Sequence, residues 1–430
     1  MKRVSLFLIL IPLILNSRLY AQSPDEKIGT LINNSDYFEL DEQYALLKDS
    51  IHPMLTIFSE VMLNFSFNNP KETCIYADSL IRNFQQEIGF GNVVSMIMIK
   101  SQSLAEMEEY ALAADNIKAF TDAASIHMDS ATTKSLYDTY RYYDRLRSIP
   151  KSQLLRPSAD TEIPIDIDTL KVGGNMMYIP VRINGKEERF ILDSGCPTSA
   201  FFSERMAQKY NVRTVFDSLI VNGTGTGYGR LGFLDSIKVG DMTLKNLLIT
   251  VVPSNPSVDS IFRVDAVLGQ PIMKLAGEIQ IYPQKKKVIF PIHHTPLPQS
   301  GRNMIIHASH PYIKTYHLDE RLIMHFDTGN SSSNLHYNFY EKNKNEIEKL
   351  GTKYSRLSGG YGSVGMKEFY RLPSFELKIG NTVFNMKNME ISTEPVFVSQ
   401  GNENGALGMA FIKLFDKVTV NFDQMFVDVE

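Results

Sequence analysis

The C-terminal part of this 430-residue chain contains an internal repeat, which limits the possible folds more than any other feature. Ile237-Lys238-Val239-Gly240 matches Leu377-Lys378-Ile379-Gly380 at an offset of 140 residues (377 − 237). The segment 268–275 matches 407–414 at almost the same offset of 139 residues (407 − 268). Separate matches at nearly one offset are hard to produce by chance, so they indicate a duplicated structural unit.

Both copies consist of short alternating apolar and polar runs separated by Gly-rich turns, which is typical of β-strands. In each copy a Leu-Gly pair is followed by a short helical segment and a final strand. We therefore expect two homologous β-rich lobes, at residues 165–293 and 296–430.

An apolar strand ends in an acidic triplet in each lobe, Asp193-Ser194-Gly195 in the first and Asp327-Thr328-Gly329 in the second. The two aspartates are 134 residues apart (327 − 193), close to the offset of the repeat. A lone Asp before Gly is most often a turn residue. Equivalent places in duplicated lobes instead predict two facing carboxyl groups. Such groups about 3 Å apart cannot both ionise cheaply, so one keeps a proton and the pair holds an acid and a base.

This order of elements resembles the aspartic protease superfamily, with the two-lobed, pepsin-like or retropepsin-like arrangement of bacterial members. The resemblance covers both lobes and none of the chain before them. It implies an all-β two-lobed acid-protease fold with closed-barrel-like lobes, in which Asp193 and Asp327 activate water. It also implies that the hydroxyl groups of Ser194 and Thr328 bond across to the other lobe. The residues expected to support the catalytic loops are Ser194, Gly195, Thr328 and Gly329.

Two Gly-rich segments, 222–229 and 358–365, follow the aspartates at similar distances and resemble the flaps that cover the cleft in this family. Glycine permits a mobile hairpin tip and close approach of a substrate backbone. The alternative is an ordinary solvated turn in each case. If the segments are flaps, the residues expected to contact substrate are Gly225, Gly227, Tyr228, Gly360 and Tyr361.

The residue after each triplet departs from the family pattern, which usually has a small residue that steadies the outer carboxylate oxygen. Cys196 and Asn330 stand here instead. Cysteine fits sterically, and asparagine can donate a hydrogen bond or leave that task to Ser331. His325 lies two residues before Asp327 on an alternating strand, so it should share that residue's face and could affect its pKa.

Residues 22–150 have apolar positions at helical spacing and few glycines or prolines, which predicts an all-α domain. The pattern resembles a degenerate tetratricopeptide-type repeat array; a plain helical bundle is the alternative. Pro-containing residues 151–164 are interpreted as a linker. The helices are expected at 36–48, 51–66, 70–86, 91–106, 108–124 and 130–147.

The first 21 residues have the zones of a secretory signal: basic residues, an apolar run too short to span a bilayer comfortably, and small residues ending at Ala21. Cleavage after Ala21 would make the protein secreted or periplasmic, with no membrane span left. Two cysteines, Cys74 and Cys196, exclude a framework of disulfides. A net charge of −4 provides no basic surface for nucleic acid.

We expect from these features an aspartic endopeptidase that cleaves extended peptides or proteins, needs no metal or organic cofactor, and has a helical domain able to bind a protein partner. Two alternatives stay open at this point. One is a protein of the same fold that binds peptides without cutting them. The other is an interaction or scaffold protein in which the helical domain is the working part.

Overall fold

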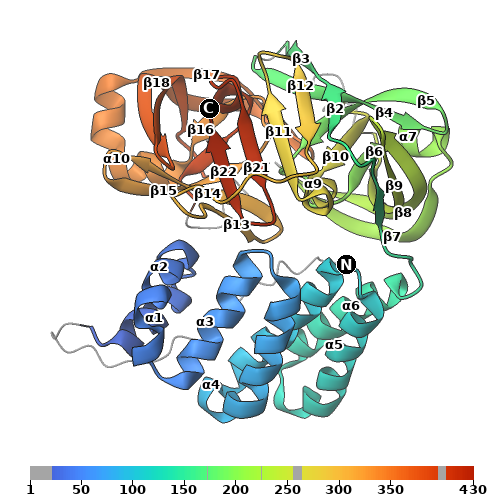
Figure 1. Cartoon of the computed structure of the whole chain (residues 1–430), viewed down its shortest axis with the longest axis vertical. Coiled ribbons are helices and arrows are strands. Elements are labelled where there is room, and N and C mark those ends of the chain that lie inside the picture. Colours follow the sequence, from blue (N-terminus) through green and yellow to red (C-terminus); the bar gives the residue numbers. More distant parts are fainter. Residues whose placement is uncertain (1–21, 172, 224, 255–263, 396–402) are drawn as a thin grey trace. The chain divides into compact units, whose positions relative to one another are not determined.

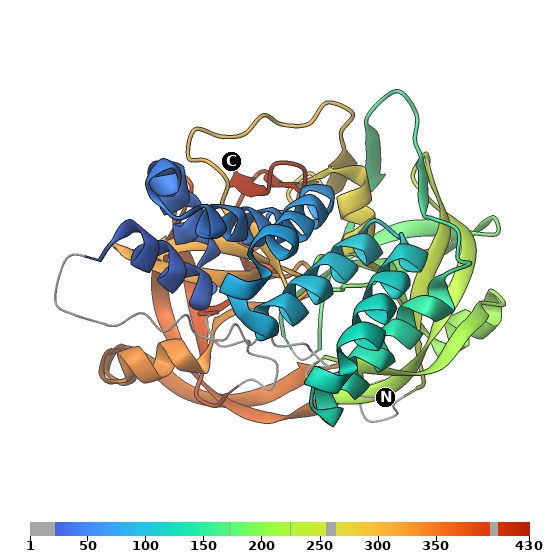
Figure 2. The same ribbon diagram turned by 90° about the horizontal axis from the view of Figure 1, so that it is seen from below.

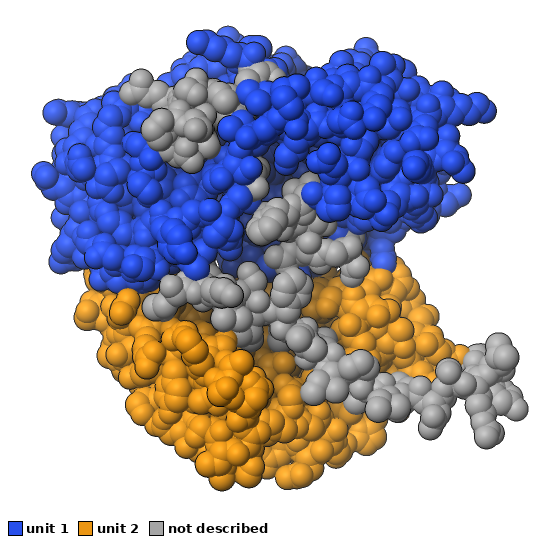
Figure 3. Space-filling view, turned by 180° about the vertical axis from the view of Figure 1, so that it is seen from behind, with its two compact units in different colours: residues 1, 152–430 blue, residues 2–151 orange. Residues whose placement is uncertain are grey.

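The computed structural model describes residues 22–430 except 172, 224, 255–263 and 396–402. The predicted signal peptide, residues 1–21, lies outside the described residues. The chain divides into a helical unit that ends at Lys151 and a β-rich unit, Ser152–Glu430 (Figure 1, Figure 3). The predicted fold class, an α-helical region followed by a two-lobed all-β region, is confirmed.

The helical unit consists of helices that follow one another with short connections (Figure 2). None of the described helices is long and apolar enough to cross a membrane. The resemblance to tetratricopeptide repeats stays a prediction. The helices are α1 (Pro24–Asn33), α2 (Tyr37–Leu47), η1 (Lys48–Ser50), α3 (Pro53–Ser66), α4 (Pro70–Glu106), α5 (Tyr110–Ala124), η2 (Ser125–His127) and α6 (Ser130–Leu146).

Helix α1 is absent from the predicted set, although its start has a readable signal. Ser23 and Glu26 form a capping box, in which each side chain accepts a hydrogen bond from the backbone of the other. Helix α4 spans two predicted helices, and its backbone leaves helical geometry at Phe84 and Gly89. Gly89 has a φ of 75° and a ψ of 161°, so the predicted boundary between 86 and 91 falls on this kink.

The first lobe is built on a nine-stranded sheet with the order β1-β9-β6-β10-β5-β4-β8-β7, to which β3 is added beside β4. The sheet curls so that β8 also pairs with β9. Two short helices, α7 (Glu204–Lys209) and α9 (Gln270–Ala276), follow β6 and β10. The strands are β1 (Gln153–Leu155), β3 (Asp166–Thr169), β4 (Asn175–Ile183), β5 (Lys186–Asp193), β6 (Ala200–Ser203), β7 (Arg213–Asn222), β8 (Thr226–Val239), β9 (Met242–Val252) and β10 (Ala266–Gly269).

The second lobe repeats this plan in an eight-stranded sheet with the order β13-β14-β15-β20-β16-β19-β18-β17. Here β14 also pairs with β18, as β4 pairs with β8 in the first lobe. Helices α10 (Tyr337–Leu350) and α11 (Met409–Ile412) follow β16 and β20. The strands are β13 (Met304–His307), β14 (His310–His317), β15 (Glu320–Phe326), β16 (Ser333–Leu335), β17 (Thr352–Gly360), β18 (Ser363–Ile379), β19 (Thr382–Ser392) and β20 (Gly405–Leu407).

The final strands of the two lobes leave their own sheets and form a shared five-stranded sheet with the order β2-β12-β11-β21-β22. Strand β11 of the first lobe pairs antiparallel with β21 of the second, so this sheet joins the lobes. The strands are β2 (Thr161–Pro164), β11 (Glu278–Tyr282), β12 (Lys287–Phe290), β21 (Val418–Asn421) and β22 (Phe426–Val429).

The interpretation of residues 151–164 as a linker differs from the structure, because this segment contains β1 and β2. Thr161 and Ile163 are buried while Glu162 and Pro164 are exposed, which is the alternation of an edge strand. Pro164 is acceptable there because an edge strand does not need every backbone donor.

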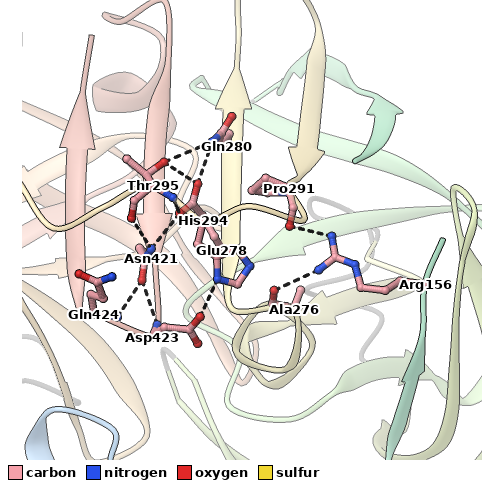
Figure 4. A network of polar contacts seen from close by, with 10 residues as sticks. All are labelled: Arg156, Ala276, Glu278, Gln280, Pro291, His294, Thr295, Asn421, Asp423 and Gln424. Carbon is pink, nitrogen blue, oxygen red and sulfur yellow. Dashed lines mark hydrogen bonds and ion pairs between the residues drawn. The ribbon is translucent and has the colours of Figure 1, made fainter. Parts of the chain in front are cut away.

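A polar network reinforces the shared sheet (Figure 4). The carboxylate of fully buried Glu278 accepts hydrogen bonds from Thr295 N at 2.7 Å, Thr295 Oγ1 at 2.8 Å and Asn421 Nδ2 at 2.8 Å. Arg156 donates to the Pro291 carbonyl oxygen at 2.7 Å. His294 Nδ1 lies 2.6 Å from Asp423 Oδ2. Because Glu278 and Asn421 belong to different lobes, these bonds hold the lobes in one arrangement.

Candidate active site

Asp193 and Asp327 stand where the middle strands of the two lobes end. Strand β5 runs parallel to β10, with Asp193 in register with Gly269. Strand β15 runs parallel to β20, and the Asp327 amide donates to the Leu407 carbonyl at 3.0 Å. The Leu-Gly pairs of the repeat therefore stand at the ends of β10 and β20, beside the two aspartates, and both strands are buried.

The second residues of the two triplets bond to each other across the lobes. Ser194 N donates to Thr328 Oγ1 at 2.9 Å, and Thr328 N donates to Ser194 Oγ at 3.0 Å. The two hydroxyl groups donate in turn to opposite strands, Ser194 Oγ to Phe326 O at 2.9 Å and Thr328 Oγ1 to Leu192 O at 2.7 Å. Both side chains are buried, so these four bonds fix one loop against the other.

The carboxyl groups of Asp193 and Asp327 share a hydrogen bond. Each also accepts from the glycine of its own triplet, Gly195 N to Asp193 Oδ1 at 2.8 Å and Gly329 N to Asp327 Oδ1 at 2.9 Å. A Cβ on Gly329 would lie 2.3 Å from Asp193 Cγ, and one on Gly195 would lie 2.8 Å from Asp327 Cγ. Glycine is therefore required at both places by the opposite carboxyl group.

Burial raises the pKa of both aspartates. For Asp193 the charge of Asp327 and the hydrogen bond between them raise the pKa further, well above its ordinary value. For Asp327 the hydrogen bond with Asp193 acts in the opposite direction and favours the charged form. The two carboxyl groups therefore titrate as a pair, and the rise in pKa is the larger one for Asp193.

Backbone amides, rather than side chains, steady the carboxylates at the unusual fourth positions. The amide of Cys196 donates to the Asp193 carbonyl oxygen at 3.3 Å and that of Asn330 to the Asp327 carbonyl oxygen at 3.0 Å. Both amides also lower the pKa of the neighbouring carboxyl group, which favours its charged form. Asn330 Oδ1 accepts from Ser332 N at 3.0 Å, so that side chain organises its own loop. Burial raises the pKa of the Cys196 thiol to about 12, which makes it a poor nucleophile.

The two Gly-rich hairpins meet at their tips. Gly225 N donates to Tyr361 O at 3.1 Å, and Tyr361 Oη donates to Tyr228 O at 3.4 Å. A Cβ on Gly227 would lie 2.5 Å from Tyr361 Oη. Gly360 ends β17 and pairs with Ser363 across the second tip. The structure thus brings Gly225, Gly227, Tyr228 and Tyr361 together as contacts between the hairpins, while Gly360 pairs within its own hairpin.

The two tyrosines differ in where their rings lie. The side chain of Tyr228 is 66% exposed, so only its carbonyl takes part in the contact between the hairpins. The ring of Tyr361 packs edge-on against Phe201 of the first lobe, with 5.7 Å between centroids. Sequence reasoning missed Phe201, because no motif marks a residue that is reached from the other lobe.

Three histidines, His310, His325 and His336, lie close to one another in the second lobe. His310 and His325 pack edge-on with 5.2 Å between ring centroids, and His310 bonds to the backbone of Gly195. Burial lowers the pKa of His325 to about 4, so its ring is neutral near neutral pH. Burial raises the pKa of Asp327, and hydrogen bonds with Asp193 and with the backbone of Gly329 and Asn330 lower it.

Residues 179–271 match the family model described as aspartyl protease. The matched segment lies in the first lobe and contains the triplet Asp193-Ser194-Gly195. No curated protein matches the chain. Among the residues that the structure describes, no group of three or more His, Cys, Asp or Glu side chains is placed to hold a metal ion.

Solved structures similar to this chain have low sequence identity. Basic 7S globulin from soybean is 11% identical, with a TM-score of 0.39, over 63% of this chain and 94% of that chain. A retropepsin-like aspartic protease from Rickettsia conorii is 17% identical, with a TM-score of 0.22, over 32% and 92%. The retroviral protease-like domain of Ddi1 from Leishmania major is 17% identical, with a TM-score of 0.19, over 24% and 78%.

Proposed function

We propose that the protein is a secreted or periplasmic aspartic endopeptidase whose catalytic residues are Asp193 and Asp327. The observation that carries the proposal is the hydrogen bond between the two carboxyl groups, at equivalent places of two lobes. A pair that shares one proton offers a base and an acid at the same point.

The larger rise in the pKa of Asp193 suggests a role for each residue. Asp327, as the charged member, takes a proton from a water molecule between the carboxyl groups, and the hydroxide oxygen attacks the peptide carbonyl carbon. Asp193 gives its proton to the carbonyl oxygen, which yields a neutral tetrahedral diol. When the C–N bond breaks, the proton on Asp327 passes to the leaving nitrogen and a diol proton returns to Asp193. The acid and base roles are then restored.

The hairpins would bind the substrate backbone. Their tips offer backbone N–H and C=O groups at Gly225 and Tyr361, which now pair with each other. An extended peptide can replace this pairing with main-chain hydrogen bonds to both hairpins. The rigid base formed by Ser194 and Thr328 would meanwhile keep the carboxyl groups aligned.

Isosteric amides test the mechanism. Asp193→Asn and Asp327→Asn, alone and together, should abolish cleavage of a peptide library followed by mass spectrometry, while the circular dichroism spectrum stays unchanged. Asp217→Asn is the control, because Asp217 is exposed on β7. Full cleavage by the double variant would overturn the mechanism. Saturable peptide binding by the wild type without turnover between about pH 3 and 8 would favour the alternative, a peptide-binding protein.

A further inference from the structure

The internal repeat allows the surroundings of the two aspartates to be compared residue by residue. Ile191 and His325 each lie two positions before an aspartate, so strand alternation puts them on the face of the carboxyl groups. Ile191 is in register with Tyr178 on β4, and His325 is in register with Tyr312 on β14. The two tyrosines are therefore equivalent, but the residue paired with Tyr178 is apolar and the residue paired with Tyr312 is polar.

On the first lobe these positions are hydrophobic. Met176, Ile191 and Val267 form a buried cluster, against which partly buried side chains pack. We call this group the apolar flank of the dyad. The packed side chains are Leu170, Tyr178, Cys196, Phe201 and Val264.

On the second lobe the equivalent positions carry groups that form hydrogen bonds. His310 stands two residues before Tyr312 as Met176 does before Tyr178, and His325 replaces Ile191. Glu403 takes the place of Val264. Asn404, which follows Glu403, accepts a hydrogen bond from the His336 amide at the start of α10. Asp265, which follows Val264, accepts one from the Ser203 amide at the start of α7 in the same way. We call His310, Tyr312, His325, His336 and Glu403 the polar flank.

Contacts connect the polar flank into one group beside the dyad. The ring centroids of Tyr312 and His325 are 5.4 Å apart, and Tyr312 hydrogen-bonds to the Glu403 carboxylate. His336 Nδ1 lies 3.5 Å from Glu403 Oε1. His310 reaches across to the backbone of Gly195, next to Asp193. The polar flank therefore touches the catalytic loop of the opposite lobe.

Three imidazole nitrogens of the polar flank lack hydrogen-bond partners. His310 Nδ1, His325 Nε2 and His336 Nδ1 are buried and have no hydrogen-bond partner among the residues that the structure describes. The Gly195 bond raises the pKa of His310, the sign expected when an imidazole N–H donates to a carbonyl. Since Nδ1 is the unpaired nitrogen, Nε2 is the donor and Nδ1 is left as an acceptor. A buried acceptor without a donor costs free energy, which a bound donor would recover.

We propose that, given the proposed peptidase function, the polar flank selects a hydrogen-bond-donating side chain on one side of the scissile bond, and the apolar flank selects a hydrophobic side chain on the other. Lysine and arginine satisfy the His310 acceptor and are attracted by the Glu403 carboxylate. Glutamine and asparagine satisfy only the acceptor and rank second. A leucine there would leave His310 Nδ1 unpaired.

The test replaces two histidines of the polar flank with the residues found at the equivalent positions of the first lobe. His310→Met and His325→Ile place the side chains of Met176 and Ile191 at the equivalent positions. In competition between peptides that differ only at the selected position, wild type should prefer lysine to leucine by on the order of tenfold to a hundredfold in kcat/KM. The double variant should lose or reverse this preference and keep cleavage of peptides that are hydrophobic on both sides. His127→Met, an exposed histidine of the helical unit, is the control.

The outcomes separate this proposal from the proposed function. Suppose that the wild type cleaves peptides and Asp193→Asn abolishes this cleavage. The role of the polar flank alone is then overturned if the wild type shows no preference for a donor side chain, or if the double variant keeps the wild-type preference. If the wild type does not cleave, binding of the same peptides with a reduced scissile bond is measured by fluorescence anisotropy. Equal affinities for the lysine and leucine peptides overturn the proposal. Should the double variant unfold, His310→Gln, whose side-chain oxygen is still an acceptor, must retain the lysine preference that His310→Met loses.

Discussion

Ser194 and Thr328 donate their backbone amides to each other's hydroxyl groups, at 2.9 and 3.0 Å, from loops that are 134 residues apart in the chain (328 − 194). Their own hydroxyl protons go to carbonyl groups of the opposite lobe. Every donor and acceptor in this group is satisfied and buried, so each lobe fixes the position of the other's aspartate. A duplicated fold can build a shared site only if such a contact holds the copies together.

Thr328→Val should separate this contact from simple packing. Valine has nearly the same shape, but the Ser194 amide and the Leu192 carbonyl would lose their partner inside the protein. We expect a loss of about 2–4 kcal/mol in the free energy of unfolding by urea, and a larger loss in kcat than in KM. Thr250→Val is the matched control, because Thr250 Oγ1 is buried without a partner among the described residues. A loss no greater than that of the control would contradict the assigned role.

Gly329→Ala should inactivate the enzyme through steric contact alone. The new methyl group would lie 2.3 Å from Asp193 Cγ, so the carboxyl groups must move apart and their shared hydrogen bond must break. Peptide cleavage should fall by at least about a hundredfold, because a misplacement of about 1 Å is enough for that loss.

Gly365→Ala is the control for Gly329→Ala. A Cβ on Gly365, in strand β18 of the second hairpin, meets nothing within 4 Å. Its activity should stay close to wild type. Equal activity of the two alanine variants would show that the close approach of Gly329 to Asp193 is not needed for catalysis.

Sequence reasoning located the two triplets and the two hairpins because they are local patterns that the repeat presents twice. It could not predict the shared sheet, since β2 pairs with β12 and β11 pairs with β21 over more than a hundred residues. The same applies to His310, which reaches Gly195 only after both lobes have folded. Local periodicity carries no information on such pairings.

The hairpin tyrosines show a second limit. Irregular register between β7 and β8, around Phe216, interrupts simple alternation in the first hairpin. The direction of the Tyr228 side chain therefore cannot be counted from the strand start. In the second hairpin β17 and β18 pair without a shift, and Tyr361 stands at the turn. It is Tyr361, not Tyr228, whose ring reaches the opposite lobe.

Tyr361→Ala should weaken substrate binding through the hairpins. The change removes the ring that packs on Phe201 and the hydroxyl that bonds to the Tyr228 carbonyl. We expect a rise in KM of about tenfold, with a smaller change in kcat, because the dyad itself is not touched. Tyr228→Ala, which removes a mostly exposed ring, is the control. A larger effect from Tyr228→Ala would reverse the assignment.

The polar flank should make the protein sensitive to mild acid. Burial lowers the pKa of His310, His325 and His336 from 6.5 to about 4, so the unfolded chain binds protons that the folded chain does not. Stability is therefore complete above pH 6.5 and is lost as the pH falls toward 4, by about 3 kcal/mol at most for each histidine. The dyad acts in the opposite direction, because the raised pKa values of Asp193 and Asp327 favour the folded state as the pH falls.

Urea denaturation at several pH values between 7 and 4 separates the two effects. In wild type the histidines should dominate, so the free energy of unfolding should fall with pH over this range. His325→Ile removes one titrating group and should make the fall shallower, by about one proton bound per molecule in the linkage slope. His127→Met, an exposed histidine, should leave the slope unchanged. Parallel curves for wild type and His325→Ile would contradict a buried neutral histidine at this position.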